Sequence, residues 1–367
     1  MRKYFFTILI VFGLITSCNE NLDSIETGPQ FDRASLLENW FTNHINPSYN
    51  NFSNELSQLS SEVLNAKNNG VNETNLEELR NSFHQTYKAW QYVEMFNIGK
   101  AEEIYYSSTM NIYPVNTARV ESNINSGNYD LNNANNFAAQ GLPTMGYLLY
   151  GIGSSNSEII DKLSDANYIN YLMSITNQMT INTSAIINDW ETYKSEFLSS
   201  TDNTATSAVN MMVNDFIYYY EKGFRANKFG IPGGVFSSTP IPENLESHFS
   251  GSSKELSLEA MSAIKAFFIG RHALNGTTYS GSSLKSIILE LDQNLGQNNL
   301  ATRISDKLDV AIEKINDLDE SFYNQIQNDN NKFLQTYDAI QEVVVLLKVD
   351  MLQLLSINVD YVDADGD

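Results

Sequence analysis

Apolar side chains recur at steps of three and four along most of this 367-residue chain. One run of this kind contains Phe52, Leu56 and Leu59, and another contains Tyr337 and Ile340. Residues at this spacing lie on one face of an α-helix, whereas a half-buried strand would alternate apolar and polar residues. Sustained alternation is absent from the sequence, so we predict an all-α fold.

The predicted helices fall into two groups on either side of a polar, turn-forming segment at 199–204. We therefore expect an N-terminal helical bundle at 31–200 and a C-terminal helical bundle at 201–355, packed together, with a polar tail at 356–367. The apolar helix that ends at Gly151 aligns with the one that ends at Gly270. Either internal duplication or coincidence explains that alignment, because many apolar helices end in glycine.

The N-terminus has the pattern of an export signal. Residues 1–17 contain Arg2 and Lys3, then an apolar run, then small residues before Cys18, the one cysteine of the sequence. We interpret 1–17 as a signal peptide and Cys18 as a lipidated N-terminus, followed by a flexible tether at 18–30. The alternative is an ordinary signal followed by a free, buried cysteine. A lone cysteine excludes internal disulfides.

The chain is strongly acidic. Its formal net charge of −22 becomes −24 without residues 1–17, because Arg2 and Lys3 leave with that segment and no acidic residue does. This balance argues against nucleic acid as a partner and against electrostatic docking on an anionic lipid surface. The acidic end of the tail, 363–367, resembles the start of a calcium loop but lacks its downstream glutamate, so we interpret it as solvated.

The segment Gly141 to Gly151, GLPTMGYLLYG, predicts a short buried helix. Pro143 suits a first helical turn, and Gly151 suits the left-handed position just past a helix end. The segment resembles the signature of the imelysin family, G-x-H-x-x-E followed by an apolar run and a glycine. Gly141 stands at the motif glycine, but Pro143 replaces the histidine and Gly146 replaces the glutamate. A histidine and a glutamate three residues apart share a helix face and can hold one cation, whereas proline and glycine offer no ligand side chain.

Further landmarks of the imelysin family occur in the same order along the chain. They are Trp90 with Glu94, Tyr113-Pro114, Arg225 with Lys228, and the segment Glu246 to Ser250. The resemblance implies two helical bundles in an exported protein associated with iron uptake. It also implies a lipid anchor in the envelope of a Gram-negative bacterium, at the outer membrane and facing the periplasm or the surface, with iron-uptake envelope proteins as partners.

Some members of that family are assigned as metallopeptidases because of the G-x-H-x-x-E motif. Its loss at Pro143 and Gly146 predicts that this chain does not cleave peptides. The H-E-x-x-H motif of zinc peptidases and the G-x-S-x-G motif of serine hydrolases are absent as well. We assign no cofactor and no metal; iron or another divalent cation is the candidate if one binds.

Several polar residues are candidates for a binding cleft between the two halves. Glu94 interrupts an apolar stripe, and a buried carboxylate there would need Arg225 or Lys228 as its partner. That pairing predicts either a salt bridge between the halves or a cleft that binds an ion. Lys228 is expected to open a glycine- and proline-rich loop at 228–253. The candidate cleft residues are Glu94, Tyr113, Arg225, Lys228, Glu246, His248 and Ser250.

His248 is the strongest candidate for a metal ligand because Glu246 lies two residues away; a surface histidine in a loop is the alternative. The other three histidines are expected to pack or to be partly exposed. Three functions stay open. We favour a ligand- or partner-binding component of iron uptake without peptidase activity. The others are a metallopeptidase whose site is rebuilt from Glu94, Glu246 and His248, and a structural, partner-binding lipoprotein.

Overall fold

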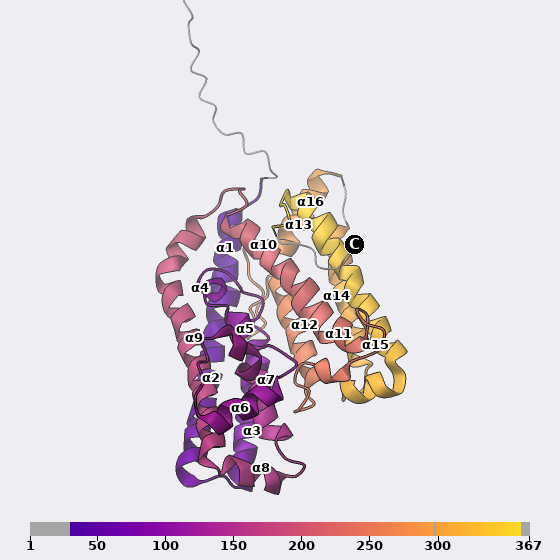
Figure 1. Cartoon of the computed structure of the whole chain (residues 1–367). Coiled ribbons are helices and arrows are strands. Elements are labelled where there is room, and N and C mark those ends of the chain that lie inside the picture. The colour runs from indigo at the N-terminus through magenta and orange to yellow at the C-terminus, as the bar shows by residue number, and fades with distance from the viewer. Residues whose placement is uncertain (1–29, 297–298, 361–367) are drawn as a thin grey trace, which may run out of the picture.

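The computed structural model describes residues 30–296 and 299–360, and it consists of helices joined by loops (Figure 1). Within these ranges no β-strand occurs, and an isolated bridge joins Arg271 to Thr278. The all-α prediction is confirmed. Among the described helices, none is both long enough and apolar enough to cross a membrane. The predicted signal peptide, the lipid-bearing Cys18, nearly all of the tether and the acidic end of the tail lie outside the described residues.

The first half is built on helices that pack side by side (Figure 1). They are α1 Arg33–Trp40, α2 Asn46–Asn69, α3 Glu73–Trp90 and α9 Ala166–Ser199. Helix α2 contacts both α3 and α9, and a π-helical turn joins α1 to α2. The long connection between α3 and α9 carries short helices: α4 Lys100–Glu103, α5 Tyr106–Met110, α6 Thr117–Ser126, α7 Gly141–Gly146 and α8 Asn156–Leu163.

The second half begins with α10, Ala208–Tyr218, which continues directly into a π-helical stretch, Tyr219–Gly230, and then into α11, Ile231–Gly233. The remaining helices are α12 Ser253–Ile269, α13 Leu284–Asn294, α14 Leu300–Asn316 and α15 Phe322–Val345, with a π-helical stretch, Leu346–Met351, leading into α16 Leu352–Leu355. Helix α14 packs against both α12 and α15 (Figure 1).

The loop predicted at 228–253 begins later than expected. Lys228 lies inside the π-helical stretch, and helical structure ends at Gly233. Pro232 lies in the last turn of this continuous helical run, which ends at the left-handed Gly234, with φ of 85°. Gly230 is helical, and a larger residue would not fit there because an added Cβ would lie 2.5 Å from the ring of Phe236. Gly230 therefore serves close packing, whereas Gly234 forms the turn that ends the helical run.

Helix α7 and the π-helical turn after it, Tyr147–Gly151, form the buried helix predicted for this segment. Its glycines differ from the expectation. Gly141 is the left-handed one, with φ of 76°, and an added Cβ there would lie 2.3 Å from the carbonyl oxygen of Met110. Gly151 has no positive φ; it is needed because Phe249 packs 2.4 Å from the position of its missing Cβ.

Helix α12 ends differently from the segment with which it aligns in sequence. Its C-terminal glycine, Gly270, has a φ of 72° and forms a left-handed cap. The turn that ends at Gly151 has no such cap. The structure does not show an internal duplication.

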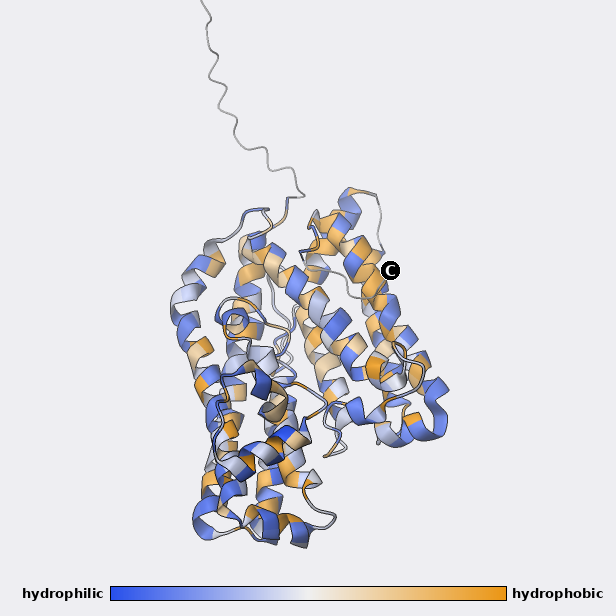
Figure 2. Cartoon of the chain, in the orientation of Figure 1, coloured by the Kyte–Doolittle hydropathy of each residue, from blue (hydrophilic) through white to orange (hydrophobic). Residues whose placement is uncertain are grey.

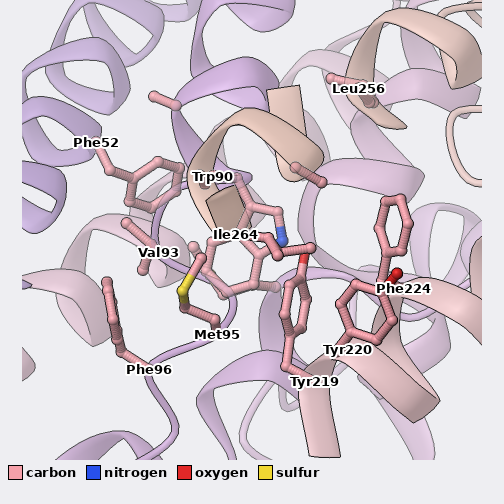
Figure 3. Packing of buried hydrophobic residues seen from close by; sticks show 14 of the residues in the cluster. Phe52, Trp90, Val93, Met95, Phe96, Tyr219, Tyr220, Phe224, Leu256 and Ile264 are labelled. Carbon is pink, nitrogen blue, oxygen red and sulfur yellow. The ribbon is translucent and has the colours of Figure 1, made fainter. Parts of the chain in front are cut away.

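An apolar cluster runs through both halves (Figure 3). Apolar residues on the helices of each half form it (Figure 2). Phe267 of α12 lies where the halves meet: its ring stacks on Trp40 of α1, with centroids 5.1 Å apart. The centroids of Phe216 and Phe96 lie 5.0 Å and 6.0 Å from it. Large aromatic side chains from both halves therefore share one core, which holds the residues between the halves in fixed positions.

Candidate functional site

A buried lysine joins two carboxylates that come from opposite halves of the chain. Lys228 Nζ lies 2.5 Å from Oε2 of Glu246 and 3.6 Å from Oε2 of Glu94. Lys228 is in the π-helical stretch, Glu94 in the turn after α3, and Glu246 in the loop before α12. The side chains of Lys228 and Glu246 are each 1% exposed, and that of Glu94 is 12% exposed. We call these three residues the Lys228 cluster.

Two amide side chains surround the Lys228 cluster. Gln91 accepts a hydrogen bond of 2.9 Å from Lys228 and donates one of 3.1 Å to Glu246. Asn111 donates to both carboxylates, at 2.9 Å to Glu246 and at 2.8 Å to Glu94. Among the described residues, Oε2 of Glu94 has no hydrogen-bond partner of ordinary geometry. Buried charges are stable only when they are paired and hydrogen-bonded, so this network fixes where each carboxylate lies.

Two carboxylates face one ammonium group, and the excess negative charge affects the pKa values of the groups around it. Burial raises the pKa of Glu94; the ammonium of Lys228 opposes this effect and the carboxylate of Glu246 adds to it. Burial, and then the charges of the same two carboxylates, raise the pKa values of Tyr113 and Tyr219 well above their usual range. These phenols therefore stay protonated at physiological pH, and each keeps an O–H that can donate a hydrogen bond.

A cavity of about 180 Å³ lies next to the Lys228 cluster. Pro143 and Gly146, where the family motif would carry histidine and glutamate, both line it. Leu245 and Ser247 also line it, whereas Glu246 between them directs its side chain to the lysine. Ser247 has a left-handed backbone with φ of 57°, which turns the chain at this point. The other lining residues are Tyr87, Tyr113, Pro114, Val115, Glu243, His248 and Phe249.

A second, wider hollow of about 420 Å³ is lined by Glu94 itself and has a different chemistry. Asp215 lines it as well; burial raises the pKa of this carboxyl to about 7, and the charges of Glu102 and Asp360 add to the effect. Exposed Tyr105 also contributes to the wall. The wide hollow therefore carries several acidic side chains in its wall, whereas the smaller cavity is mainly apolar.

The structure brings together part of the predicted cleft set. Of the two expected partners of Glu94, Lys228 lies beside it. Arg225 lies elsewhere: it donates a hydrogen bond of 2.9 Å to Tyr337 and another to Gln341. The predicted salt bridge between the halves is therefore formed by the lysine and not by the arginine.

The side chains of His248 and Glu246 lie in different parts of the site, although the two residues are two positions apart in sequence. Glu246 contacts Lys228, whereas His248 lines the 180 Å³ cavity, and its buried Nδ1 has no hydrogen-bond partner among the described residues. In the part of the chain that the structure describes, no three His, Cys, Asp or Glu side chains lie close enough together to hold a metal ion. The alternative site built from Glu94, Glu246 and His248 is therefore not assembled in this structure.

Ser250, His44 and His84 are not part of the Lys228 cluster. Ser250 shares a hydrogen bond with Ser247 inside their own loop. His44 is buried, and burial lowers its pKa to about 3, so it is neutral. His84 bonds to Glu255 of α12 at 2.7 Å, which adds a polar contact between the halves.

Sequence reasoning missed Gln91 and Asn111, which are 0% and 7% exposed and bond the Lys228 cluster. Asp215 was missed as well. The signal for all three is a polar residue among apolar ones, the same signal that identified Glu94. Such a residue needs a partner if it is buried, but the sequence does not say which partner it finds.

The family model described as Imelysin matches residues 45–349 of the chain. The fold is similar to that of a protein from Parabacteroides distasonis described as an iron-regulated protein A precursor, with a TM-score of 0.72, 16% identity, and coverage of 89% of this chain and 96% of that one. It is also similar to an imelysin-like protein from Psychrobacter arcticum, with a TM-score of 0.67, 17% identity, and coverage of 91% and 99%. No curated protein matches the chain. At these identities the structural likeness concerns the fold.

Proposed function

This chain belongs to the imelysin family, and from that premise we propose that it is an exported lipoprotein associated with iron uptake, which binds a ligand or a partner between its two halves without cleaving peptides. The family and the likeness to an iron-regulated protein are consistent with a role in iron uptake. The cavity between the halves supports binding, and among the described residues no three His, Cys, Asp or Glu side chains lie close enough together to hold a catalytic metal ion.

One observation carries the proposal: the ammonium of Lys228 lies between the carboxylates of Glu94 and Glu246. A metallopeptidase needs a cation with an open coordination position and a base that activates water. The lysine already occupies the space between these carboxylates and neutralises one charge there. Its ammonium would repel a metal ion at that place.

The positions of the family motif support the same proposal. Pro143 and Gly146 line the cavity but present no side chain that ligates a metal. His248 and Glu243 line the same cavity, but among the described residues no third His, Cys, Asp or Glu side chain lies close enough to complete a metal site. The space that a catalytic centre would occupy is thus an apolar hollow, which suits an organic ligand.

We also propose that the mature protein is anchored in the outer membrane by lipid attached to Cys18. We further propose that its partners are iron-uptake proteins of the envelope. The sequence before Cys18 supports the anchor. The strongly acidic chain would not adhere to anionic lipid by charge, so attachment depends on the anchor. A Cys18→Ser variant should leave the membrane fraction.

A cleavage assay tests the proposal. The purified protein is incubated with casein, with and without the chelator 1,10-phenanthroline, beside a relative with an intact G-x-H-x-x-E motif. We expect no cleavage by this chain. Chelator-sensitive cleavage that disappears in a Glu246→Ala, His248→Ala variant would contradict the proposal and favour a rebuilt metallopeptidase.

A further inference from the structure

We infer that the 180 Å³ cavity binds a single aromatic ring that carries a neutral hydrogen-bonding group. This inference rests on the proposed function, because it names the class of ligand for the same site between the halves. The argument depends on the size of the cavity, on the polar groups in its wall and on the charge around it.

The size of the cavity fits one ring. A protein cavity of about 150 Å³ lined by apolar side chains holds benzene, and this cavity has about 180 Å³. Its wall is mainly apolar: Val115, Pro143, Leu245 and Phe249 contribute to it. A flat, compact ring would fill the space, whereas a fused ring system or a flexible chain would not be enclosed.

One polar group in the wall has no hydrogen-bond partner among the described residues. Tyr113 is protonated, as argued above, and its hydroxyl makes no hydrogen bond to another described residue. Nδ1 of His248 is buried away from the cavity surface and does not serve a ligand. A ligand hydroxyl can accept a hydrogen bond from the phenol of Tyr113, which an apolar ring alone cannot do.

The surrounding charge selects against anions. Glu243 lines the cavity, and the charges of Glu246 and Glu94 add to the effect of burial in raising the pKa of the Tyr113 phenol. Among the described residues, no lysine or arginine lines the cavity. A benzoate-type ligand would meet this negative field, whereas a neutral phenol would not.

The ring can come from a free small molecule or from a tyrosine side chain of a partner, since both present the same phenol. p-Cresol is the free counterpart of that side chain, and acetyl-tyrosinamide presents it on a peptide backbone. The carboxylate 4-methylbenzoate matches p-cresol in shape but carries a negative charge. Calorimetric titration of the tether-free protein with these three compounds compares the two sources and tests the charge selection.

We expect saturable one-site binding of p-cresol with a dissociation constant below about 1 mM, and no saturable binding of 4-methylbenzoate. Acetyl-tyrosinamide that binds at least as tightly as p-cresol assigns the ring to a partner's tyrosine, and weaker binding assigns it to a free molecule. Either result supports a ring site. Absence of saturable binding by both phenols, or equal binding of the benzoate, would overturn the inference.

Two variants locate the binding. Gly146→Leu places a side chain in the cavity, where an added Cβ has one neighbouring atom within 4 Å, Cζ of Phe83 at 3.5 Å. We expect p-cresol affinity to fall by about tenfold or more. Tyr113→Phe removes one hydroxyl and should weaken p-cresol about fivefold. The matched control Tyr105→Phe removes a hydroxyl outside the cavity and should leave p-cresol affinity unchanged.

Circular dichroism melts show whether the Gly146→Leu variant folds, and Tyr113→Phe keeps the test decisive if it does not. Unchanged p-cresol affinity in Tyr113→Phe and in folded Gly146→Leu would overturn the assignment of the ring to this cavity. Failure of the ring site is distinct from failure of the proposed function. If the protein does not bind p-cresol and does not cleave casein, the ring site alone is refuted. Chelator-sensitive casein cleavage refutes the proposed function whether or not p-cresol binds.

Discussion

Lys228 and Glu246 form an ion pair of 2.5 Å in which each side chain is 1% exposed. The two residues are 18 positions apart, on a helix and in the loop that follows it. Through Lys228 the pair also reaches Glu94, which belongs to the first half. The pair therefore does two things at once: it ties the halves together, and it places a protein cation where a metal would otherwise neutralise two carboxylates.

Replacing Lys228 with methionine should destabilise the protein strongly. Glu94 and Glu246 would keep their buried positions without a cation, and breaking a buried pair in this way costs about 3–5 kcal/mol. Urea unfolding measures the loss. Lys265→Met, which breaks an exposed pair with Asp309, is the matched control and should cost about 1 kcal/mol or less.

Adding Glu246→Gln to Lys228→Met should restore part of the lost stability, because one unpaired charge is removed. Equal, small losses for Lys228→Met and for Lys265→Met would show that the buried pair does not bear on stability.

Asp215→Asn should change how stability depends on pH. Burial raises the pKa of Asp215 from 3.8 to about 7, so between these values the folded protein keeps a proton that the unfolded chain has lost. Stability from this group is complete below pH 3.8 and is lost as the pH rises to about 7. Asparagine does not titrate, so the variant should gain up to about 4 kcal/mol relative to the natural protein between pH 4 and pH 8. Melting temperatures across this range measure the gain, and parallel curves for the two proteins would contradict the assignment.

Gly141→Ala and Gly146→Ala should differ sharply although they lie in the same helix. At Gly141 the backbone has φ of 76° and the new Cβ would meet a carbonyl oxygen at 2.3 Å. We expect a loss of about 3 kcal/mol or more, or failure to fold. At Gly146 the nearest atom is 3.5 Å away, so alanine should change the free energy of unfolding by less than about 1 kcal/mol. Similar losses at the two positions would show that the left-handed turn at Gly141 is not required.

Restoring the family motif with Pro143→His and Gly146→Glu should create a metal site. Both positions line the cavity that His248 also lines, so the new side chains and that histidine would face one space. Calorimetry should detect stoichiometric zinc binding in this variant, and His248→Ala should weaken it. A folded variant that binds no zinc would mean that the cavity geometry differs from that of a metal-binding relative.

The helical architecture follows from local pattern. Apolar residues at three- and four-residue spacing predicted the long helices, because such a stripe allows a helix to bury one face. Glu94 was identified from its place within a stripe, and Lys228 was correctly named as one of its two expected partners. These successes depend on properties that a short segment carries by itself.

The errors concern contacts between distant segments. The sequence predicts a left-handed cap at Gly151. Glycine is required there instead because Phe249, almost a hundred residues later, packs against it. Glu246 and His248 look like a ligand pair by spacing, yet the left-handed backbone at Ser247 lies between them and their side chains serve different sites. Gln91 joins the cluster through residues that its own segment does not contain. Sequence spacing cannot reveal such contacts, because tertiary packing decides them.

The most direct test of the central claim is calorimetric titration of the tether-free protein with ferrous iron and zinc, repeated on the Glu246→Ala, His248→Ala variant. The account predicts no saturable metal binding that depends on these two residues, because the ammonium of Lys228 already lies between the carboxylates of Glu94 and Glu246 and neutralises one of their charges. Stoichiometric binding by the natural protein that the variant loses would contradict it and would place a metal centre at this site.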